Sequence, residues 1–282
     1  MHAMNFVLTS LPQTWPWLIL IAALTAGWCG QRGPAFALLA AFGGAALARG
    51  HLEPLSLAVL AAGLLLAVLI PSTRGPAGLA GHAVLVLWSL ALGAHLLPGV
   101  QNLLILDQVR AAPGSAPYSL HLNLDKPLVF FALLLAWPAL LQRKDPAGKP
   151  AFQSGLLLLA ALLPLALLTG ALDLEPSLPD WTLLWIASNL LLTCLAEEAF
   201  FRGYLQQGLC LRFGPAAGIA AASILFGLAH VAAGPAVAAF AAFLGLACGL
   251  GYSGSGRFRV PVLMHFAFNI THLLLFTYPG PA

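Results

Sequence analysis

The feature that most constrains this chain is a series of ten apolar runs separated by short polar segments. The runs lie at about 15–29, 34–48, 54–70, 79–97, 127–141, 152–172, 181–201, 215–233, 235–252 and 260–277. The sequence is 60% hydrophobic and 7% charged, whereas soluble domains carry about 25% charged residues. A soluble fold cannot bury so much apolar surface. At about 20 residues per membrane span, we predict an all-α polytopic membrane protein with roughly eight to ten transmembrane helices.

Basic residues are distributed unevenly between the segments that separate these runs. If the N-terminus is outside and the sides alternate, nine Lys and Arg residues fall inside and three outside, which follows the positive-inside rule. The inside residues are Arg32, Arg74, Arg143, Lys144, Lys149, Arg202, Arg212, Arg257 and Arg259, and the outside ones are Arg49, Arg110 and Lys126. We therefore expect ten spans with both termini outside.

The small net charge of +3 and the lack of a dense basic cluster argue against a nucleic-acid partner. The four cysteines, Cys29, Cys194, Cys210 and Cys248, form no CxxC pair, so the sequence predicts neither a zinc site nor a disulfide framework.

We divide the chain into N-terminal transmembrane helices at 1–180, with a long loop at 99–126, and a core at 181–277. The loop has a turn centre rich in Pro, Gly and Ser at 113–117 and alternates polar and apolar residues from 118 to 124. Its simplest interpretation is an interfacial segment. The alternative is a lid that guides substrate, because long loops in compact domains are often functional.

Two adjacent carboxylates, Glu197 and Glu198, stand at the end of an apolar run, with Arg202 beyond them. Ionisable residues at membrane depth are costly, and their default interpretation is functional. On a helix, Glu198 and Arg202 are i,i+4 neighbours and are expected to pair. Glu197 points about 100° away, toward the apolar interior. Different environments separate the roles of paired carboxylates, so we predict that Glu197 is a general base and that Glu198 is structural. The alternative is that both only anchor the helix end.

Two further polar patches follow at helical spacing. His230 comes four residues after Phe226 in an apolar run, and His265 is followed four residues later by Asn269. The imidazole and amide of the second pair share a helix face and would form a donor pair for a developing oxyanion. His272 continues this face, and we interpret it as structural.

These motifs, EExxxR, FxxxH and HxxxN in this order, resemble those of the CPBP membrane proteases, a family of type II CAAX prenyl endopeptidases and bacterial "Abi" proteins of bacteriocin processing and self-immunity. The resemblance covers about a third of the chain. It implies an intramembrane glutamic endopeptidase without cofactor or metal, whose active site lies in a cavity among the last four helices. Glu197 would be the base and His230 would hold the same water. His265 and Asn269 would form the oxyanion side, with Glu198, Arg202 and Phe226 as support.

The resemblance leaves the substrate open. The Leu-, Ala-, Gly- and Pro-rich composition is typical of a GC-rich bacterium, where prenylated proteins are not expected. We therefore expect a multi-pass protein of the bacterial inner membrane that acts on a membrane-anchored protein or peptide, with the lipid bilayer as its surroundings.

Three alternatives stay open. The first is a metal-dependent protease that holds an ion through Glu197, His230 and His265, because three protein ligands plus water form a catalytic zinc pattern. The second is a non-catalytic immunity or scaffold protein that retains these residues. The third is a proton-coupled transporter, although the chain shows no matching pair of interrupted helices in its two halves.

Overall fold

The computed structural model describes residues 2–282, with side chains described from residue 13 onward. Each of the ten apolar runs forms a helix, so the predicted all-α class is confirmed. The helices before the sheet are α1 (His2–Trp28), α2 (Arg32–Ala48), α3 (Pro54–Leu69), which is extended by a 3₁₀ turn at Ile70–Ser72, and α4 (Gly75–Gly93). Those after the sheet are α5 (Leu128–Ala136), α6 (Lys149–Leu168), α7 (Thr182–Ala187), α8 (Leu195–Glu198), α9 (Gln207–Phe213), α10 (Pro215–Leu228), α11 (Pro235–Ser255) and α12 (Arg259–Leu275).

Length and hydropathy separate these helices into two groups. Within the described part of the chain, five segments are long and apolar enough to cross a membrane: Pro54–Ser72, Gly75–Gly93, Lys149–Leu168, Thr182–Phe213 and Pro235–Ser255. The other apolar helices include three of 10–17 residues: Arg32–Ala48, Pro215–Leu228 and Arg259–Leu275. The chain is therefore an integral membrane protein, but the predicted eight to ten spans require some of its shorter helices to cross as well.

Prolines set many of these helix boundaries. Pro54, Pro150 and Pro235 stand in the first turn of their helices, where the missing N–H has no partner to lose. The helix α5 has only nine residues and ends just before Trp137 and Pro138, because proline disfavours helical backbone at the residue preceding it. The fifth run is thus shorter than a span, as its length predicts.

The chain forms two compact units. The first contains the chain up to Asp107 together with Ser119–Leu140 and Asp180–Ala196. The second contains Gln108–Tyr118, Leu141–Pro179 and Glu197–Ala282. The division at residue 180 that the motifs suggest stays a prediction.

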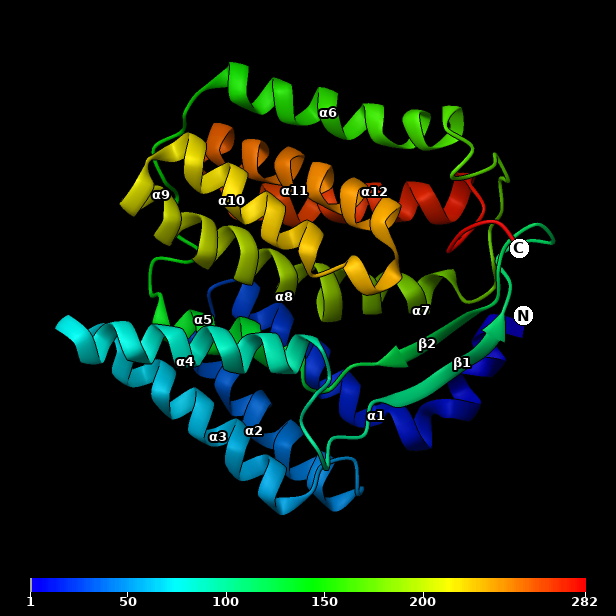
Figure 1. Cartoon of the computed structure of the whole chain (residues 1–282). Helices are drawn as coiled ribbons and strands as arrows, with labels where there is room; N and C mark the ends of the chain where they lie inside the picture. Colours follow the sequence, from blue (N-terminus) through cyan, green and yellow to red (C-terminus); the bar gives the residue numbers. More distant parts are fainter. Residues whose placement is uncertain (1) are drawn as a thin grey trace. The chain divides into compact units, whose positions relative to one another are not determined.

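In the first unit, α2 packs on α1, and the wholly apolar α5 packs against α3 (Figure 1). A hydrogen bond holds the start of α5 close to the end of α4. Asp125 is 1% exposed, and its Oδ1 lies 2.8 Å from Nδ1 of His95. His95 has a φ of 55°, a left-handed conformation that is uncommon outside glycine. His95 also lies 3.0 Å from Asn102 Nδ2, and its amide donates to the Leu92 carbonyl oxygen at 3.2 Å, so several contacts hold it at the helix end.

In the second unit, α11 lies between α6 and α10 (Figure 1). Gly256 ends α11 in the left-handed region, with a φ of 65°. A Cβ there would also meet the carbonyl oxygen of Lys144, so only glycine fits this turn without strain.

The loop at 99–126 contains a β-hairpin. The alternation of polar and apolar residues at 118–124 is consistent with a strand there, but we did not predict the hairpin. Strands β1 (Leu103–Val109) and β2 (Tyr118–Leu122) pair with each other, and Figure 1 draws them antiparallel. The turn between them is anchored within the second unit. Glu175 accepts hydrogen bonds from the Gly114 amide at 2.6 Å and from the Ser115 hydroxyl at 2.7 Å. Ser115 Oγ in turn accepts one from the Tyr278 amide at 3.0 Å.

Replacing Glu175 by alanine is expected to loosen this turn, because hydrogen bonds to a charged group contribute about 1.5–3 kcal/mol each. Hydrogen exchange measured by mass spectrometry should show faster exchange over residues 108–118 than in the unmodified protein. The exposed Asp180, replaced by alanine, is the control and should leave this exchange unchanged. Equal protection of the turn in both variants would show that Glu175 does not anchor it.

Candidate active site

The two carboxylates lie on a helix of mixed type. The segment Thr182–Phe213 is continuous, but its α-helical turn Leu195–Glu198 stands between two π-helical stretches, Ser188–Cys194 and Ala199–Gln206. π-Helical turns are rare and frequently mark functional sites. No feature of the sequence predicts these π-helical stretches. From Glu197 onward, all the predicted site residues belong to the second unit.

Glu198 is a fully buried member of a three-residue hydrogen-bond network. Its Oε1 accepts a bond from Arg202 Nη1 at 2.8 Å and lies 2.9 Å from Nδ1 of His265. Glu198 and Arg202 are both 0% exposed, so the predicted i,i+4 ion pair is confirmed. The bond to His265 joins this helix to α12 and was not predicted. Because an ionised carboxylate only accepts, Nδ1 of His265 is the protonated nitrogen.

Glu197 has a different environment. Its side chain is 12% exposed, and its Oε2 lies 3.9 Å from Nε2 of His265. This distance is longer than a hydrogen bond and is suited to a bridging water. In neutral His265, Nε2 would accept a hydrogen bond. In the doubly protonated ring, Nε2 would donate a hydrogen bond. The two glutamates therefore contact opposite nitrogens of one imidazole, and only Glu197 retains access to solvent-sized molecules.

Phe226 connects the three patches. This fully buried ring lies 4.7 Å from the His230 ring and 5.6 Å from the His265 ring, centroid to centroid. The Arg202 guanidinium carbon lies 4.4 Å from the same centroid, within the range of a cation–π contact. Phe226 thus brings both histidines and the ion pair to one aromatic side chain.

His230 lies beyond the last helical residue of α10, Leu228, and not within a helix as the spacing predicted. The chain turns here because a short 3₁₀ helix, Val231–Ala233, leads to Gly234 and Pro235, where α11 begins. Nδ1 of His230 lies 2.8 Å from the Phe226 carbonyl oxygen. Donation to that oxygen fixes the tautomer and leaves Nε2 as an acceptor. Nε2 of His230 can therefore accept a hydrogen bond from a water molecule.

Asn269 and His272 both follow His265 along α12. Asn269 is half-buried and stands one helical turn after His265, so the two side chains share a face. His272 Nε2 lies 3.0 Å from the Thr277 carbonyl oxygen at the end of α12. That bond agrees with a structural role for His272.

Two glycines of α11 allow this helix to pack closely against side chains of the site, and neither was predicted as a site residue. A Cβ at Gly245 would lie 3.0 Å from Arg202 Nη2 and 3.3 Å from the Phe226 Cβ. A Cβ at Gly249 would lie 2.8 Å from Gln206 Oε1. The signal was present as a GxxxG pattern, which marks close helix contact in membranes. Gly227 of α10 likewise permits close packing, because a Cβ there would meet Ala238 and Ala242 of α11.

The residues of the metal-dependent alternative do not form a ligand cluster. Among the side chains that the structure describes, those of residues 13–282, no three His, Cys, Asp or Glu residues are grouped so that they could hold an ion. The arrangement suits proton transfer, because the Glu197 carboxylate lies 3.9 Å from the His265 imidazole.

The fold and this site define a multi-pass membrane protein with a buried glutamate–histidine centre. Comparison with known families adds a specific match. Residues 179–271, about a third of the chain, match the family described as type II CAAX prenyl endopeptidase Rce1-like. This segment is therefore similar to Rce1-like domains, in agreement with the CPBP/Abi family that the three motifs resemble. No curated protein and no solved structure matched the chain.

Proposed function

We propose that this protein is an intramembrane endopeptidase that hydrolyses a peptide bond of a membrane-anchored protein or peptide with a water activated by Glu197. The single observation that carries the proposal is the 3.9 Å separation between Glu197 Oε2 and His265 Nε2 in the segment similar to Rce1-like domains. The two groups are too far apart for a direct hydrogen bond but near enough to act on one peptide bond, which supports a carboxylate that activates a water beside an imidazole that binds the oxyanion.

The proposed chemistry gives each residue a separate role. Glu197 removes a proton from the water as the water oxygen attacks the carbonyl carbon, and Nε2 of His230 accepts the second water hydrogen bond. The doubly protonated His265 donates from Nε2 to the developing oxyanion, together with the Asn269 amide. The charge of His265 is balanced by Glu198, which is itself held by Arg202. Glu197 then delivers its proton to the leaving amine, so no covalent intermediate is required.

The substrate class follows from where the centre lies. The glutamates belong to a helix that is long and apolar enough to cross a membrane, so a substrate segment anchored in the same membrane reaches them without crossing water. Since the composition is typical of a bacterium, we place the protein in the inner membrane and expect a lipid-anchored or single-span peptide in place of a prenylated protein.

Purified protein in liposomes, incubated with a panel of membrane-anchored reporter peptides, tests the proposal. We expect cleavage at one bond, with the new termini identified by mass spectrometry, and no cleavage by the Glu197→Gln variant. If the unmodified, folded protein cleaves none of a broad panel, the non-catalytic immunity or scaffold function is favoured instead.

Repeating the same assay with a chelator distinguishes the metal-dependent alternative from the proposed mechanism. Activity of a metal-free preparation should survive chelator, because Glu197 and the histidines act on the water directly. Loss of activity with chelator and its return with a divalent ion would contradict the metal-independent mechanism.

A further inference from the structure

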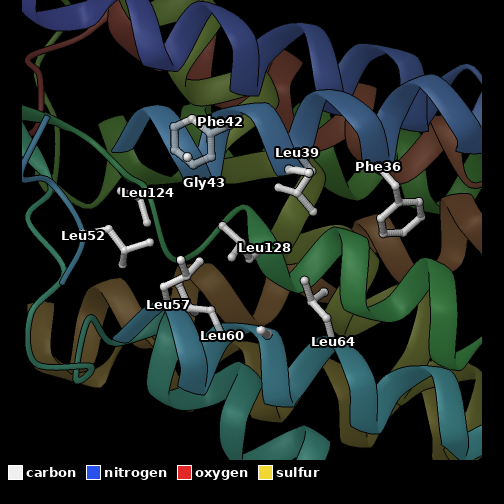
Figure 2. Close-up of a pocket in the computed structure, with 13 residues that line it drawn as sticks. Phe36, Leu39, Phe42, Gly43, Leu52, Leu57, Leu60, Leu64, Leu124 and Leu128 are labelled. Carbon is white, nitrogen blue, oxygen red and sulfur yellow. The ribbon is translucent and has the colours of Figure 1, made fainter. Parts of the chain in front are cut away.

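The first unit contains an apolar cavity that the proposed peptidase chemistry does not use. Its volume is about 420 Å³, within the roughly 300–1,000 Å³ typical of small-molecule sites. It lies between α2 and α3, and Leu124 and Leu128 near the start of α5 complete it (Figure 2). All thirteen lining residues are apolar or glycine.

The lining divides into a buried floor and an open rim. Leu39, Leu60 and Leu128 are buried, and Figure 2 shows leucines of α2 and α3 facing each other across the space. The rim includes the exposed small residues Ala40, Gly44 and Ala61. The cavity therefore opens between α2 and α3, and α3 begins the apolar segment Pro54–Ser72 that is long enough to cross a membrane.

Water fits this cavity poorly. An internal water needs two to four polar partners, and the lining offers no polar side chain. The cavity extends along α2 from Phe36 to Gly44, about 12 Å at 1.5 Å per residue. A single extended hydrocarbon chain fits along this length and meets only apolar groups.

We infer that this cavity binds one acyl chain of a bilayer phospholipid. Lipid tails are as apolar as leucine side chains, so a chain enters from the bilayer without a desolvation cost. It gains the dispersion contacts that an empty cavity forfeits. The bilayer supplies acyl chains in large excess over any other apolar ligand, and mass action favours the abundant ligand.

Photolabelling of the full-length protein tests the inference. The protein is reconstituted in phosphatidylcholine vesicles that contain a phosphatidylcholine with a diazirine on its acyl chain, irradiated, digested and mapped by mass spectrometry. Labels should concentrate on the peptides that carry the cavity lining of α2 and α3. Labels spread evenly over the lipid-facing surfaces of all helices would overturn the inference.

Two glycines of α2 provide a matched pair of variants. A Cβ at Gly44 or at Gly33 meets no atom within 4 Å, but only Gly44 lines the cavity. Gly44→Leu should lower cavity labelling about tenfold, equivalent to about 1.4 kcal/mol of binding free energy, and Gly33→Leu should leave it unchanged. If Gly44→Leu fails to fold, Ala61→Leu fills the cavity from α3. Unchanged labelling in a folded, cavity-filled variant would contradict the inference.

A competition arm distinguishes the phospholipid from a lipid-anchored peptide. An excess of unlabelled phosphatidylcholine should suppress labelling, whereas an excess of a farnesylated peptide should have no larger effect than an unlipidated one. Selective suppression by the farnesylated peptide would assign the cavity to a lipid anchor and overturn the inference.

Discussion

Glu198→Gln is expected to lower the free energy of unfolding by about 3–5 kcal/mol, because it leaves the Arg202 guanidinium without a counter-charge in a buried site. Both side chains are 0% exposed, and the substitution is nearly isosteric. Arg202 already has buried Nε and Nη2 atoms without hydrogen-bond partners, so the carboxylate at 2.8 Å is its main compensation. The measurement is equilibrium unfolding in mixed micelles, followed by tryptophan fluorescence.

A double-mutant cycle provides the control for this prediction. Replacing a buried ion pair by apolar groups is often close to neutral, so Glu198→Gln combined with Arg202→Met should recover much of the stability that the single variant loses. The recovery will be incomplete, since Arg202 also lies over the Phe226 ring. A Glu198→Gln variant that loses less than about 1 kcal/mol would show that the pair does not support the fold.

Glu197→Gln is expected to lower the rate of reporter cleavage by about 10²–10⁴-fold, the usual contribution of a general base. Its effect on unfolding should be smaller than that of Glu198→Gln, because the Glu197 side chain is 12% exposed whereas Glu198 is fully buried. The assay compares single-turnover cleavage in liposomes with unfolding of the same preparation.

Glu53 supplies the matched control for the Glu197 substitution. This exposed carboxylate belongs to the first unit, and Glu53→Gln should cleave at the unmodified rate. If folded Glu197→Gln cleaves at the full rate, Glu197 has no part in the mechanism. If Glu53→Gln loses as much cleavage activity as Glu197→Gln, the assay reports membrane insertion and not chemistry.

Helix positions and the Glu198–Arg202 pair were predictable because both depend on local spacing. Runs of about 20 apolar residues have few alternatives in a bilayer, and residues four apart face each other on a helix. The anchoring of the 108–118 turn was not predictable, because its partners Glu175 and Tyr278 are 61 and 163 residues away along the chain. No periodicity encodes such contacts.

The site itself was predicted as a set of residues but not as a geometry. The motifs singled out His265, yet the spacing did not show that Nδ1 binds Glu198 while Nε2 faces Glu197. The position of His230 past the end of α10 depends on the turn that leads to Pro235. The apolar cavity between α2 and α3 left no trace in the sequence, because leucine, alanine and glycine are common throughout the chain.

The division of roles between the adjacent glutamates is the central claim, and the cleavage rate per folded molecule of Glu197→Gln and Glu198→Gln tests it most directly. We predict that Glu197→Gln is destabilised less than Glu198→Gln and does not cleave, whereas Glu198→Gln is strongly destabilised and its remaining folded fraction still cleaves. A stable Glu198→Gln that cleaves nothing, beside a Glu197→Gln that cleaves normally, would contradict the claim and exchange the two assignments.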